Sequence, residues 1–262
     1  MRNIQLALCF CLPVCLGAQT FQLAAPQIHV DSIFFKSRAV VRLDFDLEGA
    51  SVHYTTTGTF PTNQSPAYRQ PLEIDSSTSV RAIARHPDFI SSPMAEVQVL
   101  KVNFQPDSVQ LKTAPDSLYP GGGVAALFDL KNGSRDLKDG QWLGFLQDTV
   151  VVEVRFAQPV TCKNVVLSTL FAPESWVFPP ARVEVLNLSD DRPPQYMGAW
   201  QGPAIDNLRD RPGVGGPFRK VLLRPAAVDR LQIRVIPYAQ LPAEHPGAGQ
   251  PAWLFLNEIV FQ

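Results

Sequence analysis

The chain has 262 residues, of which 24 are proline and 16 are glycine, and only 18% are charged. So much loop-forming composition argues against a helical bundle or a coiled coil and predicts a mostly β protein. Lysine and arginine number 23 against 24 aspartate and glutamate, which gives a formal net charge of −1. Because no block of basic residues occurs either, electrostatic binding to nucleic acid or anionic lipid is excluded.

The first 18 residues have the features of an export signal. A positively charged start precedes an apolar segment at residues 4–16, and small residues follow up to Ala18. This segment is too short to cross a bilayer, which needs about 20 apolar residues. A lipoprotein signal that ends at Cys15 is the alternative, but Val14 is larger than the residue usual before a lipidated cysteine. We therefore expect cleavage after Ala18 and export to the periplasm or the cell surface.

Cleavage at this position changes the cysteine content. Cys9, Cys11 and Cys15 leave with the signal and Cys162 remains alone, so the mature chain has no internal disulfide. Its stability must then come from hydrophobic cores. Cys162 lies next to an apolar run, and we interpret it as a small buried hydrophobic residue.

Short runs of alternating polarity begin near residue 22. In residues 38–46, apolar side chains alternate with charged ones, and residues 78–86 repeat the pattern. Alternation with a period of two is typical of half-buried strands. Turn-forming glycine, proline and asparagine residues separate these runs. We predict a small β-sandwich over residues 22–102.

A second set of alternating runs occupies residues 104–262. The clearest are residues 150–156, 231–235 and the strongly apolar 253–261. They predict a second sandwich. The joint at residues 102–107 is too short for a flexible tether, so we expect the two sandwiches to contact each other. Gln201–Pro217 is rich in glycine and proline and is predicted to be a long surface loop.

The first half carries a recognisable motif. Residues 52–62 read VHYTTTGTFPT, and they are followed by Ser-Pro-Ala-Tyr at 65–68 and Thr-Ser-Val-Arg-Ala-Ile-Ala at 78–84. This pattern resembles the chitobiase/β-hexosaminidase C-terminal domain, with Thr57 where that family prefers aspartate. The resemblance implies an immunoglobulin-like sandwich and no catalysis.

The second half resembles the discoidin-like, coagulation factor 5/8 type C domain that ends many bacterial family 20 β-N-acetylhexosaminidases. Its matching segments are Tyr119–Gly123, Ala126–Asp129 with Gly133–Ser134, Asp139–Phe145, Ser175–Pro180, His245–Gly249 and Ala252–Ile259. Leu130 replaces a glycine of the family pattern at a place where positive φ is common, and leucine resists that conformation. The predicted fold class is therefore all-β, an immunoglobulin-like sandwich followed by a discoidin-like jelly roll.

The catalytic part of those hexosaminidases is missing from the sequence. Their adjacent Asp-Glu pair does not occur in this chain, and their (β/α)8 barrel alone needs roughly 250 residues. No nucleophile elbow, phosphate loop or zinc signature is present. We therefore expect a protein that is not an enzyme, although a hydrolase of another type remains a third alternative.

Calcium is the ion that the discoidin resemblance implies. Such modules hold it near the start of the domain with carbonyl, carboxylate and hydroxyl oxygens, together with a glutamate near the C-terminus. The residues at comparable places are Asp129, Asn132, Ser134 and Glu258. Oxygen donors suit calcium better than zinc. The alternative is that Glu258 pairs with an arginine or caps a loop amide.

Four side chains in loop-like segments of the second domain are candidates for contact with sugars. Trp176 and Phe178 lie among prolines, Trp200 lies beside the glycine-rich and proline-rich loop, and His245 precedes Pro246 and Gly247. An aromatic ring can stack on the C–H face of a sugar, and a histidine can add a hydrogen bond. For Trp176, structural packing is the equal alternative. Trp142 and Trp253 lie in strand-like runs and are expected in the core.

These observations predict an exported, non-catalytic protein that binds glycans containing N-acetylhexosamine. The alternative is a structural tail that docks on a separately encoded hexosaminidase or on a surface complex.

Overall fold

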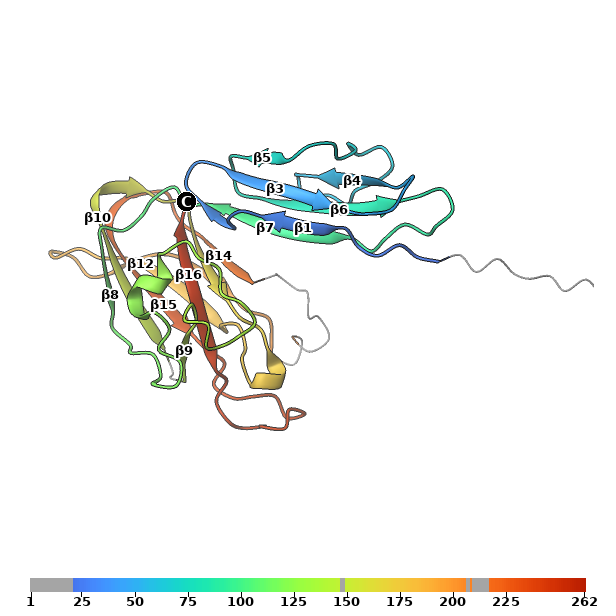
Figure 1. Cartoon of the computed structure of the whole chain (residues 1–262). Coiled ribbons are helices and arrows are strands. Elements are labelled where there is room, and N and C mark those ends of the chain that lie inside the picture. The colour runs from blue at the N-terminus through green and yellow to red at the C-terminus, as the bar shows by residue number, and fades with distance from the viewer. Residues whose placement is uncertain (1–20, 147–148, 206–207, 209–216) are drawn as a thin grey trace, which may run out of the picture.

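The computed structural model describes residues 21–146, 149–205, 208 and 217–262 (Figure 1). The predicted export signal and most of the loop predicted at Gln201–Pro217 lie outside the described residues. The fold is all-β and consists of two β-sandwiches in sequence, an immunoglobulin-like one and a discoidin-like jelly roll. Within the described residues, no helix has the length and hydropathy needed to span a membrane.

The first sandwich is built from two sheets, with strand orders β1-β3-β5 and β2-β7-β6-β4. Its strands are β1 (Gln27–Val30), β2 (Phe34–Phe35), β3 (Ala39–Asp44), β4 (Ser51–Thr55), β5 (Leu72–Ile74), β6 (Thr78–Arg85) and β7 (Ala95–Lys101). Alternation places Ala39, Val41 and Leu43 in the core and turns Arg42 and Asp44 to solvent. The residue pattern and the observed strand therefore agree.

The second sandwich pairs a five-stranded sheet, β13-β12-β15-β10-β8, with a four-stranded sheet, β14-β11-β16-β9. Its elements are β8 (Ser108–Leu111), the 3₁₀ helix η1 (Gly123–Leu127), β9 (Leu143–Phe145), β10 (Val150–Thr161), β11 (Asn164–Thr169), the 3₁₀ helix η2 (Pro173–Ser175), β12 (Arg182–Asn187), β13 (Gln195–Gln201), β14 (Phe218–Leu222), β15 (Ala227–Ile236) and β16 (Leu254–Phe261). All strand pairs in these two sheets are antiparallel.

A continuous core lies between the two sheets of the second sandwich. From the five-stranded sheet, Leu231, Ile233 and Val235 of β15 and their cross-strand partners Val154, Val152 and Val150 of β10 belong to this core, and all six are at most 1% exposed. From the four-stranded sheet, Val165 and Leu167 of β11 and Leu254 and Leu256 of β16 belong to it. Cys162 belongs to this core at 1% exposure, and burial raises the pKa of its thiol to about 11. The interpretation of Cys162 as a buried hydrophobic residue is confirmed.

The two sandwiches contact each other through a small apolar cluster. Phe34 of β2 packs edge-on against Phe218 of β14, with ring centroids 5.7 Å apart, and Val102, Val166 and Val260 complete the buried part. The adjacent residue Phe35 points the other way, into the first core.

Hydrogen bonds add to this apolar contact. The backbone N–H groups of Asn103 and Phe104 donate to the carbonyl of Phe261 over 3.0 and 3.2 Å. Gln262 Nε2 donates to Ser77 Oγ and to the carbonyl of Lys101 over 2.5 and 2.9 Å. The short joint thus packs the two sandwiches directly together.

Candidate functional site

The loop between β11 and β12 presents Trp176 at the surface. η2 ends at this residue, whose backbone is left-handed with φ 64° and ψ 18°. A bulky residue in this region is an outlier that costs on the order of 1 kcal/mol or more. The Trp176 residue is 38% exposed, and the protein thus holds a large ring at the surface at a conformational cost.

The opposing loop supports the Trp176 ring from one side. A Cβ atom built on Gly247 would lie 2.8 to 2.9 Å from three atoms of the indole, so only glycine allows the ring to lie this close. His245 packs edge-on against the same ring with centroids 5.8 Å apart. The ring position is therefore fixed by two residues of the 237–253 loop.

His245 ties the two loops together through both nitrogens of its ring. Its Nδ1 accepts a hydrogen bond from the Gly247 N–H at 3.0 Å, and its Nε2 lies 2.9 Å from the carbonyl oxygen of Pro173. The tautomer with hydrogen on Nε2 satisfies both contacts. Because both nitrogens are used, His245 positions the loop rather than offering a free donor to a ligand.

The prediction that Phe178 is a surface ring is wrong. Phe178 is 4% exposed and packs in a small core with Leu208, Leu241 and Ala252. Its N–H donates to the carbonyl of Trp253 over 2.9 Å, which turns the side chain inward beneath the loop. Phe178 therefore supports the Trp176 loop from within and does not contact a ligand.

Trp200 lies on β13 and packs partly buried against the main core. The guanidinium of Arg219 covers its ring, with Cζ 5.5 Å from the ring centroid. Arg219 is itself buried, which lowers its pKa to about 10. One face of the Trp200 ring is thus occupied by protein, so Trp200 is a weaker candidate for stacking than Trp176.

Two further aromatic residues lie near Trp176 and were not predicted as site residues. Trp253 was expected in the core, but it is only partly buried, and its N–H donates to the carbonyl of Trp176 over 2.9 Å. Tyr119 packs edge-on against Trp253 with centroids 5.3 Å apart. Trp142, the other predicted core tryptophan, is 3% exposed and donates from Nε1 to the carbonyl of Ser134 at 2.8 Å. Sequence could not bring Trp176, Trp253 and Tyr119 near one another, because they come from three separate segments.

The calcium candidates are only partly brought together. Glu258 is 1% exposed and accepts one hydrogen bond within the described residues, from the Leu130 N–H at 3.1 Å. Burial, followed by repulsion from Asp129, raises the pKa of the Glu258 carboxyl to about 8. Asp129 accepts from the Lys131 N–H at 3.0 Å. These two carboxyl groups are therefore close enough to affect each other.

Ser134 and Asn132 are placed differently. Ser134 is exposed, its Oγ accepts from the Asp136 N–H at 3.1 Å and its own N–H donates to Asp139, so it belongs to the next turn. Asn132 is exposed. Among the described residues, no group of three or more histidine, cysteine, aspartate or glutamate side chains is arranged to hold a metal.

Leu130 adopts the positive φ that the family's glycine permits, at 64°. The Leu130 side chain is partly buried and packs against the apolar cluster between the sandwiches. That contact offsets the backbone cost, and the Glu258 carboxyl accepts from the N–H of the same residue.

One family model matches the chain. It describes the chitobiase/β-hexosaminidase C-terminal domain and matches residues 32–96, within the first sandwich. No curated protein sequence matches the chain.

Solved structures with a similar arrangement of strands include carbohydrate-binding modules. A pectin-binding module has 14% identity and a TM-score of 0.37, over 60% of this chain and 91% of that one. A chitosan-binding module of a Paenibacillus chitosanase/glucanase has 12% identity and a TM-score of 0.36, over 59% and 93%. A SusE-like protein has 12% identity and a TM-score of 0.38, over 90% and 95%.

Proposed function

We propose that the protein is an exported, non-catalytic carbohydrate-binding protein whose second sandwich binds N-acetylhexosamine-containing glycans at Trp176. The observation that carries this proposal is the indole of Trp176, a large ring kept 38% exposed on a left-handed backbone. Strain of this kind persists where the surrounding structure enforces it, and it clusters at ligand sites. The family match within the first sandwich supports an accessory role.

The supporting contacts explain how the ring is prepared for a ligand. Gly247 and His245 hold it from the 237–253 loop, while Phe178 packs beneath. A ring that is fixed before binding loses little conformational freedom when a sugar stacks on it. An aromatic contact contributes only on the order of 1 kcal/mol beyond burial. We therefore expect affinity for a single sugar near the millimolar level, about 4 kcal/mol in total.

The decisive variant is Trp176→Gly. Glycine adopts φ 64° without strain, so relief of the backbone offsets part of the packing lost with the ring. Titration with N-acetylglucosamine, followed by calorimetry or NMR, should show binding to the unchanged protein and none to the variant. Tyr196→Ala is a matched control, because Tyr196 is also an exposed ring of this sandwich, at 43%. Equal affinity of all three proteins overturns the proposal.

We further propose that Asp129 and Glu258 hold a calcium ion together with backbone carbonyls of the adjacent loop. The fit rests on Glu258, a buried carboxylate with one hydrogen bond and a second carboxylate nearby. When bound, calcium would displace the proton of the Glu258 carboxyl, neutralise the two carboxylates and fix the loop. Millimolar calcium should raise the melting temperature relative to chelator, and Glu258→Gln should remove the difference. Identical melting curves with calcium and with chelator would contradict the calcium site.

The absence of catalysis is tested with a chromogenic N-acetylglucosaminide. The purified protein should release product no faster than buffer. Turnover that survives repurification and disappears when one acidic residue is changed overturns this part of the proposal.

A docking role is the second candidate, and one surface favours it. Leu222 is 68% exposed at the end of β14, and Tyr196 on neighbouring β13 lies beneath the guanidinium of Arg224, 5.8 Å from the ring centroid. Tyrosine and arginine are enriched at the centres of protein interfaces. If the protein is a docking tail, it should co-elute with a hexosaminidase on gel filtration and Leu222→Ser should abolish this. Separate elution of the unchanged protein excludes this partner.

A further inference from the structure

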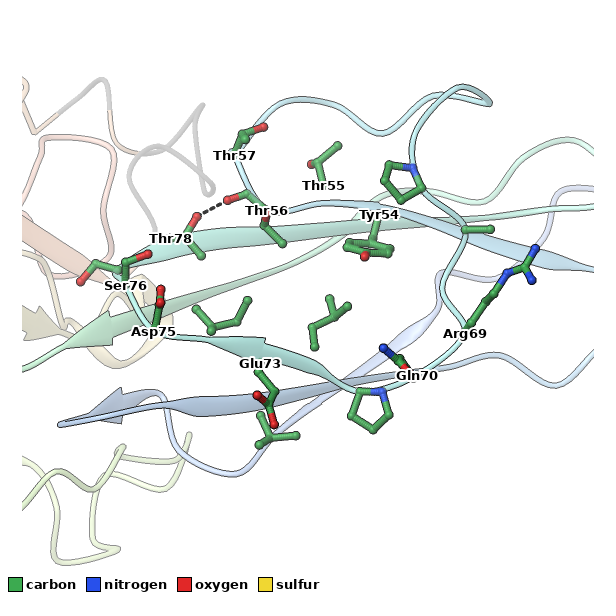
Figure 2. A pocket seen from close by; sticks show the side chains of 17 residues that line it. Tyr54, Thr55, Thr56, Thr57, Arg69, Gln70, Glu73, Asp75, Ser76 and Thr78 are labelled. Atoms are coloured by element: carbon green, nitrogen blue, oxygen red, sulfur yellow. Dashed lines mark hydrogen bonds between the residues drawn. The ribbon is translucent and has the colours of Figure 1, made fainter.

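A cleft opens along one side of the first sandwich, between the edge strands β4 and β5 (Figure 2). Its volume is about 1340 Å³, and its lining comes from β4 and the turn after it, the segment 66–71, β5 and the turn 75–78. The two sheets meet over a small core and their outer edges remain apart on this side. The sequence could not predict the cleft, because its walls come from segments separated by turns.

The floor of the cleft is partly aromatic. Figure 2 shows Tyr54 between the two walls. Tyr54 is half-buried against the first core, and Tyr68 packs edge-on against it with centroids 6.4 Å apart. Its hydroxyl forms no hydrogen bond within the described part of the chain. The residue therefore combines an apolar ring with an unused polar group at one place.

The walls carry several polar side chains that have no partner of their own. Gln70, Asp75, Thr56 and Ser76 line the cleft, and their side chains form no hydrogen bond or ion pair within the described residues. The neighbouring Glu73 is different, because its carboxylate is bound by Arg38 at 2.8 Å. The unused groups include donors and acceptors on both walls, which is the chemistry that binds sugar hydroxyls.

The rim of the cleft is held by its own hydrogen bonds. Thr78 Oγ1 donates to the carbonyl of Thr56 (Figure 2). Thr55 Oγ1 donates to the carbonyl of Thr59 at 2.6 Å. In the same turn after β5, Ser77 Oγ accepts from the Lys101 N–H at 2.8 Å and from Gln262. One end of the cleft is thus anchored to the second sandwich, so the walls are positioned before a ligand arrives.

An extended peptide fits this cleft poorly. Strand addition needs a free sheet edge. The outer edge of β4 is already paired, with the Tyr54 N–H donating to the carbonyl of Pro66 at 3.1 Å and the Tyr68 N–H to the carbonyl of Val52 at 2.7 Å. β5 has only three residues, and short edge strands discourage pairing. A ligand in the cleft would therefore contact side chains rather than the backbone of a strand edge.

The charges of the lining favour a neutral ligand. The lining has one arginine, Arg69, and two carboxylates, Asp75 and Glu73, so the cleft has no excess of positive charge with which to attract a polyanion. Its volume exceeds the range of about 300 to 1,000 Å³ typical of sites for single small molecules. Both features point to a short neutral chain that lies along the cleft.

We propose that the cleft between β4 and β5 is a second binding site, for a neutral oligosaccharide of several sugar units. Tyr54 contacts the C–H face of one unit, and Gln70 and Asp75 bind hydroxyl groups. This site lies on the other sandwich and does not depend on Trp176. Figure 1 places the 237–253 loop at the end of the second sandwich that points away from the first. The two sites therefore bind their ligands separately.

The test uses two neutral probes, the β-1,4-linked tetramers of N-acetylglucosamine and of glucose, on the purified protein carrying Trp176→Gly. This background removes the site of the proposed function, so the two proposals fail separately. We expect at least one tetramer to shift the backbone NMR signals of residues 54–57 and 70–78, and Gln70→Ala with Asp75→Ala to weaken this binding at least tenfold. Gln64→Ala with Asp46→Ala is the matched control, because both side chains are exposed and lie outside the cleft.

Three results would overturn the second site. The first is that neither tetramer shifts these signals at about 10 mM, well above the millimolar affinity expected of such contacts. The second is that the cleft pair and the control pair bind equally. The third is that polygalacturonate, a polyanion, binds the cleft more tightly than the neutral tetramers do. Melting temperatures should be the same for both pairs of substitutions, since none of the four side chains is buried.

Discussion

The two sandwiches close their cores differently. In the first, eight buried residues fill the space between a three-stranded and a four-stranded sheet, and one side stays open between β4 and β5. In the second, a larger set of 24 buried residues, counted over the described part of the chain, lies between sheets of five and four strands, and the exposed Trp176 lies on a loop. A small core leaves polar edge residues free to line a cleft, whereas a large core supports loops that hold a strained ring.

The largest expected effect is the loss of joint unfolding of the two sandwiches when the contact between them is weakened. Phe34→Ala removes a buried ring from the cluster between the sandwiches and should cost about 3 to 5 kcal/mol. Calorimetry should then resolve two unfolding transitions, because each sandwich retains its own core. Phe35→Ala is the matched control, since the adjacent ring points into the first core and its loss should lower only that sandwich's transition. A single transition in the Phe34→Ala variant contradicts this account of the joint.

The next effect concerns the buried carboxyl of the second sandwich. The pKa of Glu258 is about 8 in the folded chain, against an ordinary value of 4.5. Between these values the unfolded state binds fewer protons than the folded state. The contribution of Glu258 to stability in chelator should therefore be largest below pH 4.5, fall by up to about 1.4 kcal/mol per pH unit across the window, and level off above pH 8.

Denaturant melts at several pH values measure this slope. Glu258→Gln should flatten it, because glutamine does not titrate. A slope unchanged by this substitution would mean that other groups control the pH dependence. Added calcium should reduce the loss at high pH if the proposed calcium site is correct.

A smaller effect is expected from Gly247→Ala. The added methyl group would lie within 2.9 Å of the Trp176 ring and must displace it. Overpacking of this kind costs about 1 to 3 kcal/mol. Affinity for N-acetylglucosamine should fall although the tryptophan is still present. Gly249→Ala is the control for adding a methyl group to the same loop without a steric clash, since nothing lies within 4 Å of its added carbon. Its φ of 80° adds backbone strain. Unchanged affinity in Gly247→Ala would show that the ring position does not matter.

The strands were predictable because alternation with a period of two reports which face is buried. Residues 38–46 and 78–86 contain β3 and β6, and residues 253–261 contain β16. The loops gave no such signal. Trp176 and Phe178 lie two residues apart among the same prolines, yet one is exposed and the other is buried, because the left-handed backbone of Trp176 interrupts the extended conformation on which alternation depends. The cleft was hidden for another reason, since Gln70, Asp75 and Tyr54 come to line one cleft only when the sheets pack.

The central claim is that Trp176 is the residue of the second sandwich that contacts sugar. The chain has four tryptophans, and each gives one indole N–H signal in a ¹⁵N-edited NMR spectrum. Titration with N-acetylglucosamine should move the Trp176 signal most, while that of Trp142, which is buried and bonded to Ser134, stays in place. Saturation of binding without movement of the Trp176 signal, or with larger movement at Trp200, would contradict the claim.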